Sequence, residues 1–302
     1  MHTPATFLLS GGSGDLGSAL TEQLTAQSHR VYCLDPRQPQ HPRAIPLVGS
    51  ILQPETWQSA LQDVDVVVHI AAWHGIHALP NSPAGTRTPN EFWELNVTGT
   101  FRLFSACQQA GIRRIVNISS TSILDGDFYG FTKQMGEEIA NYFVQTSPMQ
   151  ILSLRPRAFI PHQNRVVYAN FAEWARWYWG GAVHLSDVTQ ATQLACQYLL
   201  THEKNRHAVL TVDGAYEYTW EDLAHWDTAG RGSTFRKYYA KYETLAERHN
   251  LDIATPPHRL PMQDTETLLG YRPQYSHGVL LQELAEYDKG QTKPIPTFIK
   301  TI

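Results

Sequence analysis

A tyrosine and a lysine, Tyr129 and Lys133, lie four positions apart at the start of a segment with helical periodicity. Residues at this spacing share one face of a helix. Tyrosine, with a pKa of about 10, is a weak base at neutral pH, and each unit of lowering requires about 1.4 kcal/mol of phenolate stabilisation. A lysine ammonium together with a second nearby positive charge can supply several units, so Tyr129 can exchange a proton with a substrate oxygen. In isolation, such a pair is more often a solvated helix face.

Three consecutive hydroxyl residues, Ser119, Ser120 and Thr121, end a strand-like segment shortly before this pair. Ligands of open parallel sheets bind at the carboxyl edge of the strands. The three hydroxyls are therefore expected at the ligand-binding edge of the sheet.

A glycine loop directly follows the first strand-like segment, with Gly11, Gly14 and Gly17 at GxxGxxG spacing. Such glycines permit a tight turn, the close approach of a pyrophosphate and the packing of a helix against the sheet. The first amides of that helix, at Asp15 and Leu16, then act as donors to the phosphates. The alternative is an ordinary turn at a helix start.

An acidic residue, Asp35, stands 18 residues after Gly17, at the end of the second predicted strand. This is close to the spacing of about 20 residues expected of the carboxylate that accepts the ribose hydroxyls of adenosine. A carboxylate there repels a 2′-phosphate, so NAD is expected rather than NADP, with Arg37 nearby as the feature that favours NADP. Alternatively, Asp35 forms a turn with Pro36.

The first half of the chain alternates short β-branched runs with helix-period segments. Short strands separated by helices are typical of βαβ units, whose right-handed crossovers build a parallel sheet. We therefore expect an α/β fold, a Rossmann-type doubly wound parallel sheet, over residues 1–155. The predicted strands are Thr6–Ser10, Arg30–Asp35, Asp65–Ala71, Arg113–Ser119 and Gln150–Leu154, and the predicted helices are Leu16–Gln27, Pro54–Leu61, Asn90–Ala110 and Phe128–Thr146.

The second half has a different texture, and residues 156–302 are expected to form mainly a smaller substrate-binding lobe. Elements within about 183–213, a helix over Ser186–Leu200 and a strand over Ala208–Val212, are expected to return to the sheet. The aromatic stretch Trp174–Trp179 and a basic helix-like segment, Phe235–Arg248, belong to the lobe. Pro294 and Pro296 predict a loosely packed tail.

The glycine loop, Ser119-Ser120-Thr121 and Tyr129-Gly130-Phe131-Thr132-Lys133, in this order, resemble the extended short-chain dehydrogenase/reductases, the NAD-dependent epimerase/dehydratase family. The likeness extends over nearly the whole chain, and the combined pattern is specific although each part alone is not. Further matching stretches are His69-Ile70-Ala71-Ala72, Asn96-Val97-Thr98-Gly99-Thr100, Leu154-Arg155-Pro156, His184-Leu185-Ser186-Asp187-Val188 and Leu268-Leu269-Gly270-Tyr271-Arg272-Pro273.

The resemblance implies that Thr121 polarises the substrate oxygen, that Tyr129 is the acid/base and that Lys133 also contacts the nicotinamide ribose. It places Asn96 beside the lysine, unless Asn96 is simply a solvent-facing helix residue, and Pro156 near the nicotinamide amide. It also implies a homodimer built through residues 90–110 and 128–146. Further implied cofactor contacts are Ser50, Ile51, Ala71, Ala72 and Ser119, and implied substrate contacts are His74, Ser120, Arg157 and Trp174, the last with a core position as its alternative.

Three departures from the family pattern bear on the substrate. Tyr129 follows Thr121 by only eight residues, so the flap over the site must be short, and Ser50 replaces the usual aspartate near adenine. Gly180 stands where sugar-nucleotide enzymes carry an arginine that grips the diphosphate. We therefore expect a sugar or sugar-derived substrate without a nucleotide.

Two alternatives remain open. The first is a nucleotide-sugar epimerase or dehydratase with tightly held NAD, whose diphosphate donors would come from Arg231, Arg236, Lys237, Lys241 and Arg259. The second is a non-catalytic NAD-binding sensor, since fold alone does not establish function. The presence of both Tyr129 and Lys133 favours the enzyme.

Composition excludes several other classes of protein. Of 302 residues, 42% are hydrophobic, enough for a sizeable core, and the net charge of −4 without a basic run argues against nucleic acid or an anionic membrane as partner. Neither a signal peptide nor a spanning helix is expected, and three scattered cysteines fit a reducing compartment, so a cytoplasmic location is expected. His74 and His77 lack further ligands nearby, and no metal is expected.

Overall fold

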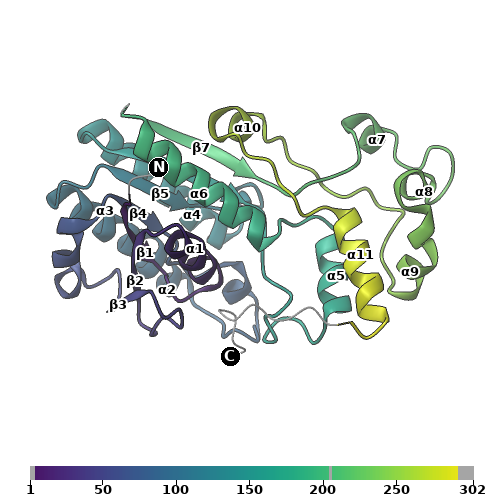
Figure 1. Ribbon diagram of the computed structural model, residues 1–302, viewed down its shortest axis with the longest axis horizontal. Coiled ribbons are helices and arrows are strands. Elements are labelled where there is room, and N and C mark those ends of the chain that lie inside the picture. Colours follow the sequence, from purple (N-terminus) through teal and green to yellow (C-terminus); the bar gives the residue numbers. More distant parts are fainter. Residues whose placement is uncertain (1–3, 204–205, 292–302) are drawn as a thin grey trace.

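A seven-stranded parallel sheet, in the order β3-β2-β1-β4-β5-β6-β7, forms the centre of the larger part of the molecule (Figure 1). This is a computed structural model, and it describes residues 4–203 and 206–291. The predicted α/β class and doubly wound parallel sheet are confirmed. The predicted tail with Pro294 and Pro296 lies outside the described residues, as does the start of the chain before Pro4.

Six of the strands fall where the β-branched runs predict them. They are β1 (Thr6–Ser10), β2 (Arg30–Asp35), β4 (Val66–His69), β5 (Arg114–Ile118), β6 (Gln150–Pro156) and β7 (His207–Val212). The seventh, β3 (Ile45–Val48), was not predicted from the sequence. It is short, half exposed and contains Pro46, a residue that sheets tolerate mainly on an edge strand such as this one.

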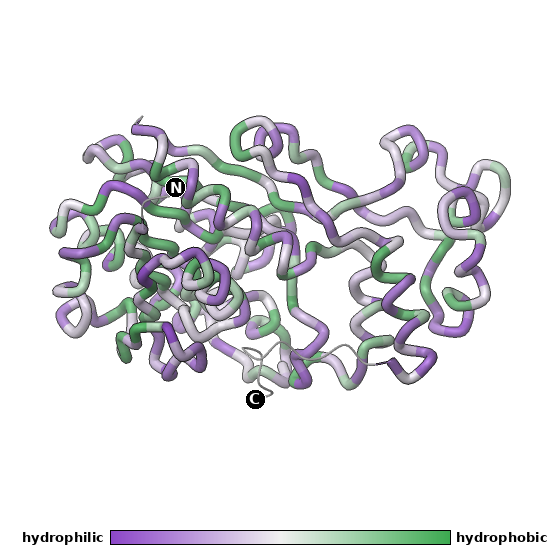
Figure 2. Tube along the Cα trace, viewed as in Figure 1, coloured by the Kyte–Doolittle hydropathy of each residue, from purple (hydrophilic) through white to green (hydrophobic). Residues whose placement is uncertain are grey.

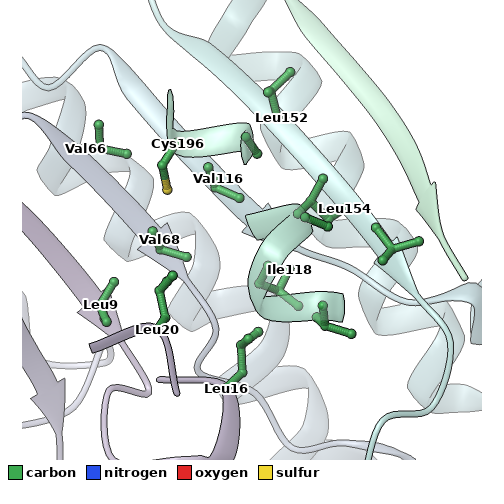
Figure 3. Close-up of a cluster of buried hydrophobic side chains, with 14 of the residues drawn as sticks. Leu9, Leu16, Leu20, Val66, Val68, Val116, Ile118, Leu152, Leu154 and Cys196 are labelled. Atoms are coloured by element: carbon green, nitrogen blue, oxygen red, sulfur yellow. The ribbon is translucent and has the colours of Figure 1, made fainter. Parts of the chain in front are cut away.

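Helices cover both faces of the sheet because alternate residues of each strand point to opposite faces. On one face, α1 (Asp15–Ala26), α6 (Leu185–Thr201) and α10 (Gln263–Leu269) bury their apolar sides. Figure 3 shows Leu16 and Leu20 of α1 and Cys196 of α6 over Leu9, Val68 and Val116 of the strands. On the other face, α3 (Gly99–Gln109) and α4 (Phe128–Thr146) pack with Leu103, Phe104 and Phe143.

The helix predicted over Asn90–Ala110 consists of three joined pieces. It begins with α2 (Pro89–Phe92), continues as a π-helix, η4 (Trp93–Thr98), and ends as α3. A π-turn inserts one extra residue and is found frequently at functional sites. Here it carries Asn96, which is only 3% exposed.

Two other predicted helices are wrong in form. Pro54–Leu61 forms two 3₁₀ helices, η1 (Pro54–Thr56) and η2 (Gln58–Asp63), because the Trp57 backbone between them leaves the helical region. Phe235–Arg248 is broken at Tyr239 and Tyr242, whose backbones also leave the helical region, into α8 (Ser233–Tyr239), η6 (Ala240–Tyr242) and α9 (Glu243–Arg248). Hydrophobic and hydrophilic residues alternate along many of the helices, as expected for helices with one buried face (Figure 2).

A smaller lobe lies beyond the carboxyl end of β7 (Figure 1). It is built from two separate stretches of chain, one with α5 (Phe171–Trp179) and one with α7 (Trp220–Ala224), α8, α9 and α11 (His277–Asp288). Its own core is rich in aromatic residues, among them Trp174, Tyr178, Tyr218, Phe235 and Tyr275. Within residues 4–203 and 206–291, no helix is both long and apolar enough to cross a membrane.

Candidate active site

The glycine loop joins the end of β1 to the start of α1, at the carboxyl edge of the sheet. Gly11 has a left-handed φ of +75°, and a Cβ there would lie 2.9 Å from the Ala71 amide nitrogen. A Cβ at Gly17 would overlap the Gly11 carbonyl oxygen. The turn and the close packing of α1 therefore require glycine at these two positions.

Gly14 differs from its two neighbours in the motif. Its backbone is extended, and an added Cβ would meet only the Gly11 carbonyl oxygen, at an ordinary contact distance of 3.4 Å. The protein's own packing therefore does not require glycine here. The space that a Cβ would occupy at Gly14 is open, so a dinucleotide phosphate could lie against the backbone there. The first backbone amides of α1, at Asp15 and Leu16, lie beside this space and could donate to the phosphate.

Asp35 ends β2 beside this loop and is 6% exposed. Its carboxylate accepts hydrogen bonds from the backbone amides of Ser13, at 3.2 Å, and Arg37, at 2.9 Å. The Arg37 side chain also reaches it, with 3.4 Å between Nε and Oδ1, while remaining 61% exposed. Asp35 is thus held against the glycine loop, where it would meet an adenosine ribose.

Four further predicted cofactor contacts lie in two pairs. Ser50 and Ile51 come shortly after β3, and Ile51 is buried against Gly99. Ala71 and Ala72 follow β4, with the Ala71 amide donating to the Ser10 carbonyl at 3.0 Å. All lie beyond the carboxyl ends of β3 and β4, at the edge of the sheet where the fold binds ligands.

Tyr129 lies in the first turn of α4, which is capped by the Asp127 side chain. Its ring is half-buried, with Gly75 against one edge, where an added Cβ would stand 3.4 Å from Cδ1. The Ser120 side chain, from a residue that is 7% exposed, lies close enough to the phenol to act on the pKa of Tyr129.

Thr121 lies next to Ser120 at the start of η5 (Thr121–Leu124). Its hydroxyl is half-buried and donates a long, 3.4 Å hydrogen bond to the carbonyl of Pro156, the last residue of β6. Thr121 and Pro156 are therefore neighbours. The short connection from Thr121 to Tyr129 contains only η5 and the Asp127 cap.

The pKa of Tyr129 is raised above its ordinary value, whereas the predicted acid/base role requires it to be lowered. Burial raises it to about 12, while the hydrogen bond from Ser120 acts to lower it and the charge of Asp127 acts to raise it. Lys133 does not provide the expected lowering in the protein alone. Burial also lowers the pKa of Lys133 itself, to about 8. At neutral pH the phenol is therefore a proton donor.

Lys133 follows Tyr129 by one turn of α4 and is 8% exposed. Glu137, one turn further on, acts to raise the pKa of Lys133. The same Glu137 carboxylate accepts two hydrogen bonds from Arg155, at 2.8 and 2.6 Å, and one from the Ser119 hydroxyl at 2.5 Å. Ser119 therefore lies behind the lysine in this buried network. The role of Glu137 was not predicted from the sequence, although its i+4 spacing from Lys133 was a usable signal.

Asn96 is buried and its side chain bonds two separate segments of the chain, so the alternative of a solvent-facing residue is wrong. Its side-chain oxygen accepts from the Trp73 amide at 2.8 Å, and its Nδ2 donates to the Trp73 carbonyl at 2.8 Å and to the Thr132 hydroxyl at 3.0 Å. Thr132 lies between the tyrosine and the lysine on α4 and donates to the Tyr129 carbonyl at 2.7 Å. Asn96 thus connects the loop after β4 to the first turns of α4 through hydrogen bonds.

The loop after β4 carries the two histidines of the sequence motif. His74 is exposed at the rim, and its ring contacts His77 with centroids 4.7 Å apart. Within the described parts of the chain, no group of three or more His, Cys, Asp or Glu side chains is placed to hold a metal ion.

Arg157 lies between the sheet and the smaller lobe, directly after the end of β6. Its guanidinium is 3.6 Å from the buried Asp213 carboxylate and donates to the Tyr216 hydroxyl and to the His258 carbonyl. Its side chain is 12% exposed, so these partners occupy most of it. Arg157 thus joins the two parts of the molecule.

Trp174 packs in the core of the smaller lobe and is 1% exposed. Its indole N–H donates to the Ile160 carbonyl at 2.8 Å, and the rings of Phe171, Tyr178 and Tyr275 surround it. The core alternative therefore holds for Trp174, and stacking of its ring on a sugar is wrong for this conformation because the ring is enclosed.

Residues 7–166, more than half of the chain, match the NAD dependent epimerase/dehydratase family. The chain belongs to this family. The family resemblance drawn from the glycine loop and the Tyr129–Lys133 pair is thereby confirmed, as is the expectation of an NAD-dependent enzyme of the epimerase/dehydratase class.

Individual relatives differ in how much of the chain they share. The chain is 32% identical over 122 residues to a 3-beta-hydroxysteroid dehydrogenase of Mycolicibacterium neoaurum, a match that spans 39% of this chain and only 33% of that relative. It is 31% identical over 130 residues to a UDP-glucose 4-epimerase of Klebsiella pneumoniae, covering 38% of this chain and 89% of the relative. A short-chain dehydrogenase/reductase superfamily protein from Agrobacterium tumefaciens with bound NAD shares the fold, with a TM-score of 0.69 at 18% identity over 95% of this chain and 98% of that one.

Proposed function

We propose that this protein is an NAD-dependent oxidoreductase or epimerase that acts on a hydroxyl or carbonyl group of a sugar or sugar-derived substrate. The observation that carries the proposal is the arrangement of Tyr129, Lys133 and Ser120 at the carboxyl edge of the sheet, next to a glycine loop whose Gly14 is open to a ligand.

In this proposal Gly11, Gly14, Gly17 and the α1 amides hold the pyrophosphate of the dinucleotide, and Asp35 holds the adenosine ribose. When bound, oxidised NAD supplies the hydride acceptor and a positive charge on its ring. Tyr129 holds the proton at its hydroxyl oxygen and exchanges it with the substrate oxygen. Ser120 and Thr121 orient that oxygen, and Lys133 supports the phenolate.

In the protein without its cofactor, Tyr129 is suited to act as an acid. With a pKa of about 12, its hydroxyl is protonated throughout the neutral range, so it can donate to a carbonyl oxygen being reduced. For it to accept a proton from a hydroxyl, added positive charge must lower this pKa toward neutrality. The direction of the reaction is therefore coupled to the charge next to Tyr129.

The basic residues of the smaller lobe bear on the size of the substrate. Arg236 pairs with Glu243 at 2.7 Å and Lys237 pairs with Asp222 at 2.6 Å, both on exposed surface, so each charge is already compensated. Arg259 differs: its guanidinium lies over the rings of Trp220 and Tyr216, and its buried Nε has no partner. These observations support a small sugar-like substrate, with Arg259 as the group that would favour a nucleotide diphosphate.

The test is a screen of free sugars, sugar acids, nucleotide sugars and a 3β-hydroxysteroid for NADH formation, with analysis of the purified protein for bound NAD. The steroid arm is included because of the likeness to the hydroxysteroid dehydrogenase. Net NADH from a free sugar or sugar acid supports the proposal. Copurified NAD with epimer formation from a nucleotide sugar would establish the nucleotide-sugar alternative. NAD binding without any turnover would establish the sensor.

We further propose that the protein is a cytoplasmic homodimer. Cys33, Cys107 and Cys196 are free and buried, as expected in a reducing compartment. Large hydrophobic side chains are exposed along the outer side of η4, α3 and α4, and a helix face of this kind supports association with a second copy. These exposed residues are Trp93, Phe101, Phe128, Phe131 and Tyr142.

A further inference from the structure

Three buried polar side chains form a hydrogen-bonded chain beneath the glycine loop. None of the three has been assigned a role in the site above. Ser10 ends β1, His69 ends β4 and Thr100 lies in α3. The three side chains are 0%, 3% and 2% exposed. His69 Nδ1 is 2.8 Å from the Ser10 hydroxyl, and His69 Nε2 is 2.8 Å from the Thr100 hydroxyl.

The direction of each hydrogen bond follows from the partners. The Thr100 hydroxyl donates its single proton to the Asn96 carbonyl at 2.6 Å, because a carbonyl can only accept. Thr100 must therefore accept from His69, which places the imidazole proton on Nε2. His69 Nδ1 then accepts the proton of Ser10, whose oxygen in turn lies 3.2 and 3.4 Å from the amides of Ile70 and Ala71.

A neutral imidazole satisfies this chain as it stands, whereas a second ring proton would require the Ser10 hydroxyl to turn and accept from Nδ1. Burial lowers the pKa of His69 to about 3, and the charge of Lys133 acts in the same direction. His69 is thus a fixed link at neutral pH and not an acid or base in the reaction.

The far end of the chain is the part of the site that surrounds Tyr129. The Asn96 carbonyl that Thr100 holds belongs to the π-helix η4, and the Asn96 side chain uses both of its amide protons and its oxygen on Trp73 and Thr132. Trp73 precedes the segment that sets Gly75 against the Tyr129 ring. A displacement of Asn96 would therefore move the wall of the phenol pocket.

We propose that His69 is a positioning residue: through Thr100 and Asn96 it holds the Trp73–Gly75 segment against Tyr129 and ties this wall to the strand end beneath the glycine loop. This inference rests on the proposed function for its catalytic consequence. A misplacement of a reacting group by about 1 Å can cost about a hundredfold in rate, so a link two residues removed can matter to turnover.

Thr100→Val removes the hydroxyl while preserving the shape, and Thr100→Ser restores it. The matched control is Thr192→Val in α6, because Thr192 is also fully buried and bonds only the carbonyl four residues earlier, at 2.8 Å. We expect Thr100→Val to lower kcat by about tenfold or more and to speed amide exchange at Trp73 and Gly75. Thr100→Ser restores both, and Thr192→Val lowers the melting temperature without either effect.

Ser10→Ala is the second variant, used if Thr100→Val does not fold, and the same two changes are expected from it. Nitrogen-15 NMR of His69 measures the link directly: we expect a proton on Nε2 and none on Nδ1 at neutral pH. A proton on Nδ1, or equal effects of Thr100→Val and Thr192→Val on kcat and on exchange, overturns the proposal. The NMR and exchange measurements need no substrate, so they still decide about the link if no turnover is found and the proposed function fails.

Discussion

Glu137 lies one helical turn after Lys133 on α4, and its carboxylate supports the positive charge of a lysine that burial disfavours. Arg155 and Ser119 hold this carboxylate in place from the other side. At neutral pH Lys133 is therefore charged, although burial makes that charge less favourable than it is in water. This conflict has consequences for stability as well as for catalysis.

Lys133→Met is expected to stabilise the protein while abolishing activity. The pKa of Lys133 is about 8 in the folded protein and 10.5 in its ordinary state, so between these values the unfolded chain binds more protons. The free energy of unfolding therefore rises with pH between 8 and 10.5 because of this group. Below pH 8 the buried charge destabilises the folded protein by its full amount. Removing the charge is worth on the order of 3 kcal/mol at pH 7.

Urea unfolding of the wild type and Lys133→Met, compared at pH 7 and pH 10, checks this prediction. The gain should shrink at the higher pH. Lys237→Met serves as the control, because Lys237 is exposed and paired with Asp222. A loss of stability in Lys133→Met at pH 7 would contradict the prediction.

Tyr129→Phe should abolish turnover and leave NAD affinity nearly unchanged. Only the hydroxyl is lost, and general acid–base catalysis contributes about 10²- to 10⁴-fold to a rate. Initial rates and calorimetric dissociation constants measure the two effects. Tyr142→Phe, on the exposed side of the same helix, should behave as wild type. Substantial turnover by Tyr129→Phe would rule out the proposed mechanism.

The two variants Gly14→Ala and Gly17→Ala should separate cofactor binding from folding. An added Cβ at Gly14 makes an ordinary contact, whereas at Gly17 it overlaps the Gly11 carbonyl. We expect Gly14→Ala to weaken NAD binding by about tenfold or more, corresponding to about 1.4 kcal/mol, with an unchanged melting temperature. Gly17→Ala should lower the melting temperature. Equal NAD affinity in Gly14→Ala and wild type would show that no phosphate approaches at this position.

Asp35 should make NAD bind more tightly than NADP. Its carboxylate repels a 2′-phosphate, and Asp35→Asn, which removes the charge but keeps the shape, should narrow the difference between the two dissociation constants. Calorimetry with both dinucleotides provides the measurement, with Arg37→Ala as the matched variant. If the wild type prefers NADP, Arg37 and not Asp35 determines the specificity at the ribose.

The exposed aromatic face of α3 and α4 should mediate dimerisation. Phe101 is 47% exposed and lies at this face, so Phe101→Glu should yield a monomer by light scattering at micromolar concentration. Val48→Glu is the control, since Val48 is 55% exposed on the edge strand β3, away from these helices. A monomeric wild type would refute the dimer.

Residues whose role depends on local spacing could be predicted from the sequence. The glycine loop, Asp35 and the Tyr129–Lys133 pair are separated by short, regular intervals, and the strands that carry them are runs of β-branched residues. The edge strand β3 was not predicted because only alternate residues of it are partly buried, and Pro46 interrupts the usual strand signal.

Roles that depend on contacts far along the chain could not be predicted from spacing, and it was the family resemblance that placed Asn96 beside the lysine. Asn96 meets Trp73 across 23 residues and Thr132 across 36, and a π-turn places it, which helical periodicity does not reveal. Arg157 meets His258 across 101 residues, so its place between sheet and lobe follows from tertiary packing alone. The pKa of Tyr129 likewise depends on burial, which the spacing of residues in the sequence does not reveal.

The smaller lobe is assembled from two stretches of chain separated by α6 and β7. Its core combines Trp174 and Tyr178 from the first stretch with Leu280 and Leu284 from the second. During synthesis from the ribosome, the first stretch therefore emerges long before the residues that cover it, while the strands of the sheet up to β6 can already pair. The aromatic side chains of α5 stay exposed in that interval. We therefore expect a chaperone that binds exposed apolar surface to bind the nascent chain at this stage.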